Sequence, residues 1–238
     1  MSLKLGKSLI CLVVVGYSVS PPWARPQNDT SQTRSDPQKL LHENTDLYFP
    51  DRAFINQGGS VDKQLGERIA WLGVYLRSIG EPPLANDSNK SESYRLVYIG
   101  FPAGKIVVLR LSISANGTAR TFAKQTAYNQ TSLLLDQENS ASREAVNGFL
   151  ESVARAKFWE LPTVESSEQR MPDGSYWYLE GARPNQCHLV YRRTPELHPN
   201  SFTDIGRYLA NDLAHLPDSV LAIPRGDRSE PAKRVAPR

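Results

Sequence analysis

Between Ser60 and Gly80, apolar residues recur at spacings of three and four, which places them on one face of a helix. This stripe consists of Leu65, Ile69, Leu72, Leu76 and Ile79. Serine is a residue type that caps helix N-termini, so the helix is expected to begin at Ser60. It is expected to end at Gly80, because the prolines at positions 82 and 83 cannot continue a helix.

The pattern then changes to runs rich in β-branched and aromatic residues, which predict strands. Three strands are expected at 94–101, 105–114 and 118–126. Asn116 and Gly117 lie between the last two, and these residue types supply the positive φ angles of a tight hairpin turn. The three segments therefore predict one antiparallel unit with short connections.

A second helix is expected over 142–157, and two further strands over 175–181 and 186–193. The buried face of that helix consists of Val146, Phe149, Leu150 and Val153. A last helix is expected to begin at Ser201, with Asp204 at the spacing of a capping box. Its buried stripe consists of Ile205, Tyr208, Leu209 and Leu213.

The order of these elements predicts the α+β class. It consists of an antiparallel sheet of about five strands built from two hairpin units, with about three helices packed mainly on one face. Short hairpin connections support the pairing inside each unit. The pattern leaves open how the two units join.

The two ends of the chain differ from this regular middle. Lys4 and Lys7 precede an apolar run over 9–15, which is the arrangement of a secretory signal peptide, and the run is too short to span a membrane. We expect a signal peptide at 1–24, a flexible linker at 25–45, one α+β domain at 46–216 and a disordered tail at 217–238. An uncleaved N-terminal anchor is the alternative for the first segment.

These features predict an exported bacterial protein of the periplasm or the medium, with no membrane span once the signal is removed. The net charge of +3 does not indicate a nucleic-acid partner, because the basic residues are scattered among acidic ones. Signal removal leaves Cys187 as the single cysteine, so no disulfide within the chain is expected.

The stretch from Trp177 to Arg193 holds most of the candidate chemistry. Cys187 and His188 are adjacent, but neighbouring residues of a strand point to opposite faces, so they cannot form a nucleophile–base pair. Cys187 is therefore expected to pack as a small hydrophobic residue.

Glu180, His188 and Arg192 are the candidate catalytic residues, since a Glu-His-Arg cluster could transfer protons or bind an anion. The turn between the strands decides whether they meet. With an even number of loop residues, Glu180 and His188 take opposite faces, and with an odd number or a bulge they share one. A buried ion pair and three exposed polar residues are the alternatives.

Aromatic residues also gather late in the chain, and they allow two interpretations. Trp177 and Tyr178, with Arg192, are candidate binding residues on a stacking surface for a ligand ring. Core and cross-strand packing is the other interpretation, and it is favoured. We predict no metal site and no cofactor, because histidine spacing and phosphate-loop or dinucleotide motifs are lacking.

Several short motifs occur in a fixed order between Gly80 and Pro195. The motif positions are Gly80, Glu81, Pro82, Tyr94, Arg95, Phe158, Trp159, Leu161, Pro162, Asp173, Gly174, Trp177, Leu179, Glu180, Gly181, Arg183, His188, Arg192 and Pro195. In this order the chain resembles a family of exported bacterial proteins of unknown function. The resemblance implies export and a small soluble domain, and it assigns no activity. The chain departs from the pattern at Cys187, where an aromatic is usual, and at Pro184-Asn185, where a glycine turn is usual.

These observations favour a small non-catalytic domain that binds an unknown envelope protein or another component of the cell envelope. The alternative is an envelope hydrolase with Glu180 and His188 as its acid–base pair. The geometry of the late hairpin separates the two.

Overall fold

The computed structural model of the chain describes residues 48–49, 63–84, 91–100, 104–165, 174–197, 200–217 and 220–221. All of them belong to one compact unit, Arg34–Arg238. The predicted signal peptide and linker, and residues 222–238 of the predicted tail, lie outside the described residues. Leu221 falls inside that predicted tail, yet it is buried in the core.

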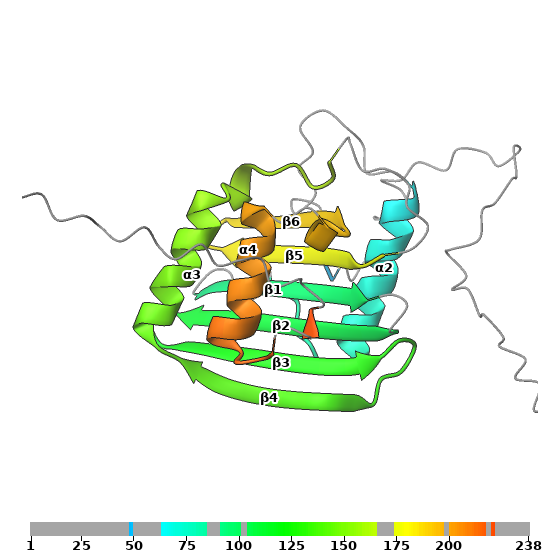
Figure 1. Cartoon of the computed structure of the whole chain (residues 1–238), viewed down its shortest axis with the longest axis horizontal. Coiled ribbons are helices and arrows are strands. Elements are labelled where there is room, and N and C mark those ends of the chain that lie inside the picture. The colour runs from blue at the N-terminus through cyan, green and yellow to red at the C-terminus, as the bar shows by residue number, and fades with distance from the viewer. Residues whose placement is uncertain are drawn as a thin grey trace, which may run out of the picture. The chain divides into compact units, whose positions relative to one another are not determined.

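The centre of the fold is a six-stranded sheet in which every neighbouring pair is antiparallel (Figure 1). Its strands are β1 (Ser91–Gly100), β2 (Lys105–Ser114), β3 (Ala119–Ala127), β4 (Leu133–Ala141), β5 (Tyr176–Arg183) and β6 (Gln186–Arg193). The order across the sheet is β4-β3-β2-β1-β5-β6. The prediction of an antiparallel α+β fold is therefore confirmed, with six strands in place of about five.

The two hairpin units join through their first strands. β1 to β4 form a meander, β5 and β6 form a hairpin, and β1 pairs with β5. In this register Arg95 lies opposite Glu180, and Leu96 lies opposite Leu179. β1 is thus a central strand with a neighbour on each side. This is the connection that the sequence pattern left open.

β4 is the strand that the hydrophobic pattern did not predict. After Leu135 its sequence is polar, and all its residues are exposed or only half-buried. It needs little apolar sequence because it is an edge strand with one neighbour, β3. Its pairing with β3 holds it in the sheet, and only Leu135 and Ala141 of this strand pack partly against the core.

Helices lie on both faces of the sheet. α3 (Arg143–Arg155) and α4 (Ser201–Tyr208), which continues as a π-helical turn over Leu209–Leu213, pack on what we call the core face. α2 (Lys63–Ser78) covers the other face, here called the α2 face: Tyr75 hydrogen-bonds Thr126, and Arg68 Nη1 donates to Tyr191 at 3.0 Å. The expectation that the helices pack mainly on one face therefore holds for two of the three.

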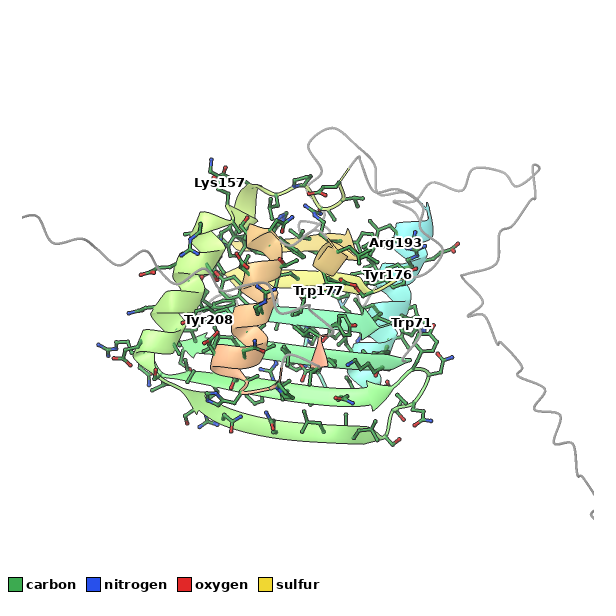
Figure 2. All side chains as sticks on the ribbon, in the orientation of Figure 1. Trp71, Lys157, Tyr176, Trp177, Arg193 and Tyr208 are labelled. Carbon is green, nitrogen blue, oxygen red and sulfur yellow. The ribbon has the colours of Figure 1, made fainter. Side chains whose placement is uncertain are left out.

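Trp177 lies at the centre of the core face and is fully buried (Figure 2). Its ring packs edge-on against Tyr98, with the centroids 5.9 Å apart, and its Nε1 donates to Ser175 Oγ at 3.2 Å. Gly206 of α4 lies directly over this ring. A Cβ at Gly206 would overlap the indole and come within 3.1 Å of Leu96. The glycine lets α4 approach the sheet closely.

Caps fix where the later helices begin. The Ser142 side chain accepts a hydrogen bond from Ala145 N, which starts α3 where the sequence predicted it. α4 is capped by Asn200, in a capping box with Thr203, and not by Ser201 with Asp204. Asn200 caps because its extended backbone directs the side chain at the first free N–H groups, whereas Ser201 is already helical.

Replacing Gly206 by alanine is expected to destabilise the protein by about 1–3 kcal/mol, because the added methyl group has no room against Trp177. Gly66 of α2 is the matched control. A Cβ there meets nothing within 4 Å, so Gly66→Ala should stabilise the protein by up to about 1 kcal/mol. Urea unfolding of both variants measures the difference, and equal effects would contradict this packing.

Candidate functional site

The turn between β5 and β6 contains two residues, Pro184 and Asn185. Asn185 takes a positive φ of 62°, which supplies the backbone conformation that a tight turn requires. With this even loop length, Glu180 lies opposite Leu189, and Gly181 lies opposite His188. Glu180 therefore faces α2, and His188 faces the core. They cannot act as the acid–base pair of the hydrolase alternative, because the sheet itself separates them.

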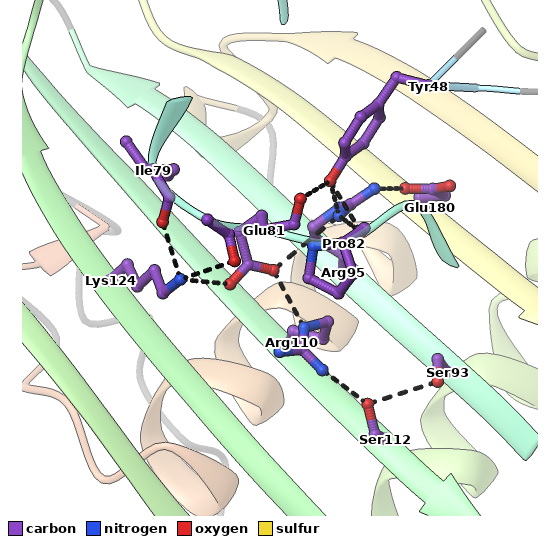
Figure 3. Close-up of polar contacts among 11 residues, drawn as sticks. Tyr48, Ile79, Glu81, Pro82, Ser93, Arg95, Arg110, Ser112, Lys124 and Glu180 are labelled. Carbon is purple, nitrogen blue, oxygen red and sulfur yellow. Dashed lines mark hydrogen bonds and ion pairs between the residues drawn. The ribbon is translucent and has the colours of Figure 1, made fainter. Parts of the chain in front are cut away.

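Glu180 instead belongs to a group that we call the interior charge network, which consists of Glu81, Arg95, Arg110, Lys124 and Glu180 (Figure 3). Arg95 is its central member and is fully buried. Its Nη2 donates to Glu180 Oε2 on the neighbouring strand, and its Nη1 donates to the Pro82 carbonyl at 2.7 Å. The guanidinium therefore links β1, β5 and the end of α2.

Glu81 is the second carboxylate of the network. Its Oε2 lies 3.0 Å from Arg110 Nε and 3.9 Å from Arg95 Nη1, and its Oε1 lies 3.2 Å from Lys124 Nζ. Three cations thus surround two carboxylates, which leaves one net positive charge. Burial of this kind is tolerated only when the charges are paired.

The end of α2 explains how Glu81 reaches this position. Gly80 has a φ of 71°, its N–H donates to Arg77 O, and Glu81 N donates to Leu76 O at 2.9 Å. These two bonds form a Schellman motif, which requires a residue that tolerates positive φ. The turn directs the Glu81 side chain under the helix. Lys124 Nζ donates to the carbonyls of Ile79 and Gly80, where the negative end of the helix favours a cation.

Tyr48, which precedes α2 in the chain, also contacts the network. Its hydroxyl donates to the carbonyls of Glu81 and Pro82, at 3.0 and 2.8 Å, and accepts from Arg95. The Arg95 guanidinium also lies 4.8 Å from the Tyr48 ring centroid. Burial raises the pKa of this hydroxyl well above its usual range, so it stays protonated and can donate.

Three buried atoms of the network have no hydrogen-bond partner among the described residues, Glu81 Oε1, Arg95 Nε and Glu180 Oε1. Glu81 Oε1 lies 3.2 Å from Lys124 Nζ as an ion pair. Burial raises the pKa of the Glu180 carboxyl, while Arg95 acts in the opposite direction. The remaining contacts of Glu180 and Arg95 join strands and a helix end. The network therefore links β1, β2, β3 and β5 to the C-terminal end of α2.

His188 and Arg192 lie on the core face, where both bind backbone carbonyls. His188 Nε2 lies 2.8 Å from Leu161 O, and its ring packs edge-on against Phe158. Arg192 Nη1 donates to Pro162 O at 3.1 Å and to Thr163 O at 3.2 Å. Burial lowers the pKa of His188 and outweighs the hydrogen bond to Leu161, so the ring is neutral at pH 7. The two side chains hold the segment after η4 (Phe158–Glu160) against β6.

The motif residues divide into two groups on opposite sides of β5. The Gly-Glu-Pro, Tyr-Arg and Leu-Glu-Gly motifs bring Glu81, Arg95 and Glu180 together on the α2 face. On the core face, Gly181 makes room for Phe158 and Trp159, because a Cβ there would lie 2.6 and 3.0 Å from their rings. The short motifs of the chain thus contain residues that contact one another in the folded structure.

The other candidates are also placed in the interior. Trp177 is 0% and Tyr178 3% exposed, so neither ring can serve as an exposed stacking surface, and the packing interpretation describes them. Cys187 is buried on the α2 face, as expected. Among the described residues, no group of three His, Cys, Asp or Glu side chains gathers that could hold a metal ion.

Sequence reasoning missed Arg95 as the partner of Glu180, and it missed the roles of Arg110 and Lys124. A signal was present, because two charged residues interrupt otherwise apolar strands at Arg95 and Arg110. A charge in a strand that is apolar on both faces needs a buried partner. Without the pairing of β1 with β5, however, the partner could not be named.

Removing both sides of the buried ion pair should cost less than the sum of the two single removals. Glu180→Leu removes the nearer carboxylate of Arg95 and leaves Glu81 as the single carboxylate among three cations, which is expected to cost about 3–5 kcal/mol. Adding Arg95→Met should cost less than the two single changes combined, with a coupling of about 1–3 kcal/mol in urea unfolding. The exposed pair Arg120–Glu138, at 2.7 Å, is the matched control. Its cycle should give about 0–1 kcal/mol, and additive changes at Glu180 and Arg95 would contradict the pairing.

The buried His188 predicts a loss of stability in mild acid. In the unfolded chain the imidazole takes up a proton near its ordinary pKa of 6.5, whereas the folded protein takes it up only at lower pH. Below pH 6.5 the unfolded chain therefore binds more protons, and the free energy of unfolding falls by up to about 1.4 kcal/mol per pH unit.

This pH dependence is measured by urea unfolding between pH 7.5 and 5. His188→Gln should flatten the curve, because glutamine can donate to Leu161 O and does not titrate. His215→Asn is the control, since His215 is exposed and asparagine tolerates its φ of 55°. An unchanged slope in His188→Gln would assign the pH dependence to other groups.

Comparison with models of known protein families gives no match, and comparison with curated proteins gives no significant match either. The resemblance to exported bacterial proteins stays a prediction from the motifs.

Proposed function

We propose that this protein is an exported domain of the bacterial cell envelope that binds another protein or an envelope component without catalysing a reaction. The observation that carries the proposal is that three ionisable motif residues make contacts inside the protein. Glu180, His188 and Arg192 each bind a neighbouring strand, carbonyl or cation in the interior. Side chains committed to such contacts are not free to exchange protons with a substrate.

The surface offers features that suit binding. Four large apolar side chains are exposed among the described residues, namely Val74, Leu133, Leu134 and Leu197. Leu134 is 64% and Leu133 36% exposed, and both lie at the start of an edge strand. Paired exposed leucines are more informative than a single one, because isolated apolar residues are common on protein surfaces.

Export rests on the N-terminal sequence, with Lys4 and Lys7 before the apolar run. The described residues contain no helix with the length and apolar character that crossing a membrane would need. The proposed place of action is therefore the periplasm or the medium.

Site-specific photocrosslinking in the full-length chain tests both parts of the proposal. A photoreactive residue at Leu134, Val74 or Leu197 should give a discrete product with a second molecule, because these side chains are the most exposed apolar groups described. Glu151, exposed on α3, is the control position and should give none. The product is expected in the fraction outside the cytoplasm.

The two parts fail separately. A chain recovered only from the cytoplasm would overturn export. A chain that is exported but gives no product at any apolar position would overturn binding.

A further inference from the structure

The two edge strands of the sheet, β6 and β4, differ in what lies beside them. Along β6, Tyr191 N donates to Thr163 O at 2.8 Å, and the side chains of His188 and Arg192 hold the carbonyls of 161–163. That edge is covered by the chain itself. β4 forms the other edge, and no described element lies beside it (Figure 1). Its outer main-chain groups are not paired with any strand among the described residues.

β4 lacks several of the features by which edge strands avoid pairing with other chains. It is nine residues long and contains neither proline nor lysine. Short edge strands, prolines, lysines, other charges and β-bulges are the usual means of blocking this pairing. Of these, β4 has Asp136, Glu138 and one register irregularity opposite Gln125 and Thr126. Two exposed leucines, Leu133 and Leu134, begin the strand. The edge therefore offers both backbone hydrogen bonds and apolar area.

The charges on β4 limit which strand can pair with it. Asp136 and Glu138 are two residues apart and so lie on the same face. Lys124, opposite Asp136 on β3, is committed to Glu81, and Arg120 pairs with Glu138 at 2.7 Å. Arg120 on β3 is thus the one cation left to balance the carboxylates of Asp136 and Glu138. The β4 edge therefore keeps an excess of negative charge.

These acids disfavour a second copy of this chain as the partner. Residues opposite each other in an antiparallel pair share a face, so a symmetric β4–β4 pair has only a few registers. Full overlap, centred on Gln137, places Asp136 opposite Glu138 of the copy, twice. Moving the two-fold axis by one residue, to Asp136 or to Glu138, places that residue opposite itself in the copy. Like charges directly opposite each other destabilise a strand pair.

Resting on the binding role proposed above, we propose that the β4 edge binds an extended segment of another protein as a seventh, antiparallel strand. The segment carries basic residues at two alternate positions, opposite Glu138 and then Asp136, followed by apolar residues against Leu134 and Leu133. Main-chain hydrogen bonds supply affinity, and the alternate side chains supply specificity.

Fluorescence anisotropy with the full-length protein tests this assignment. The probe is a labelled nine-residue peptide with Lys at alternate positions, Thr between them and two Val at its C-terminal end. It should bind at low salt and more weakly at high salt. Matched peptides with Glu in place of Lys, or with N-methylated backbone amides, should bind at least about tenfold more weakly.

The charge-reversed variant Asp136→Lys with Glu138→Lys should exchange the preference, so that the Glu peptide binds and the Lys peptide does not. Far-UV circular dichroism and thermal unfolding check that this surface change leaves the fold intact. Equal binding of the three peptides, or no binding of the Lys peptide, would overturn the edge-strand site. So would a dimer in sedimentation that the double variant abolishes, because it would assign the edge to a second copy.

Failure here is distinct from failure of the binding role. If Leu134 gives no photocrosslinked product while Val74 or Leu197 does, the protein binds a partner through another surface.

Discussion

The ion pair between Arg95 and Glu180 is the contact on which the arrangement of the sheet depends. Arg95 lies on the central strand, is fully buried, and reaches β5 and the Pro82 carbonyl at the end of α2. A guanidinium in this position has few acceptable surroundings, since an unpaired buried charge costs several kcal/mol. The correct pairing of β1 with β5 and the correct placement of α2 both satisfy it. A register shift by one residue would leave the charge without its partner.

The two faces of the sheet are stabilised by different physics. On the core face, α3 and α4 pack an apolar cluster around Trp177 and Phe149, with Gly206 and Gly181 allowing close approach. On the α2 face, the apolar stripe of α2 is buried as well, and polar contacts through Tyr75, Arg68 and the interior charge network are added to it. Hydrophobic burial is insensitive to direction, whereas hydrogen-bonded charges require one geometry. Both faces bury apolar side chains, and the charge network adds a geometric requirement on the α2 face.

The elements that were predicted correctly are those whose stability is local. The periodicity of α2, the position of the turn at Asn116-Gly117 and the Ser142 cap each depend on residues close in sequence. The predicted pair of positive φ angles in that turn was wrong, because only Gly117 has one, of 81°. β4 was missed because an edge strand takes its stability from its neighbour. The joining of the hairpin units was missed because it depends on Arg95 and Glu180, which are 85 residues apart. In the candidate site, the sequence correctly predicted that an even or odd number of loop residues decides which face Glu180 takes. The structure shows that the loop at Pro184 has two residues, so Glu180 faces α2.

The separation of 85 residues between Arg95 and Glu180 also affects the order in which the parts of the sheet can form. β1 to β4 are joined by short turns, and β5 and β6 by a turn of two residues, so each unit closes a small loop. The pairing of β1 with β5 closes a much longer one, which includes β2, β3, β4 and α3. Loop-closure entropy must be met before such contacts can contribute, so distant pairing is slow compared with local pairing. The pairing of β1 with β5 is therefore expected to form last, and until then Arg95 stays in contact with water.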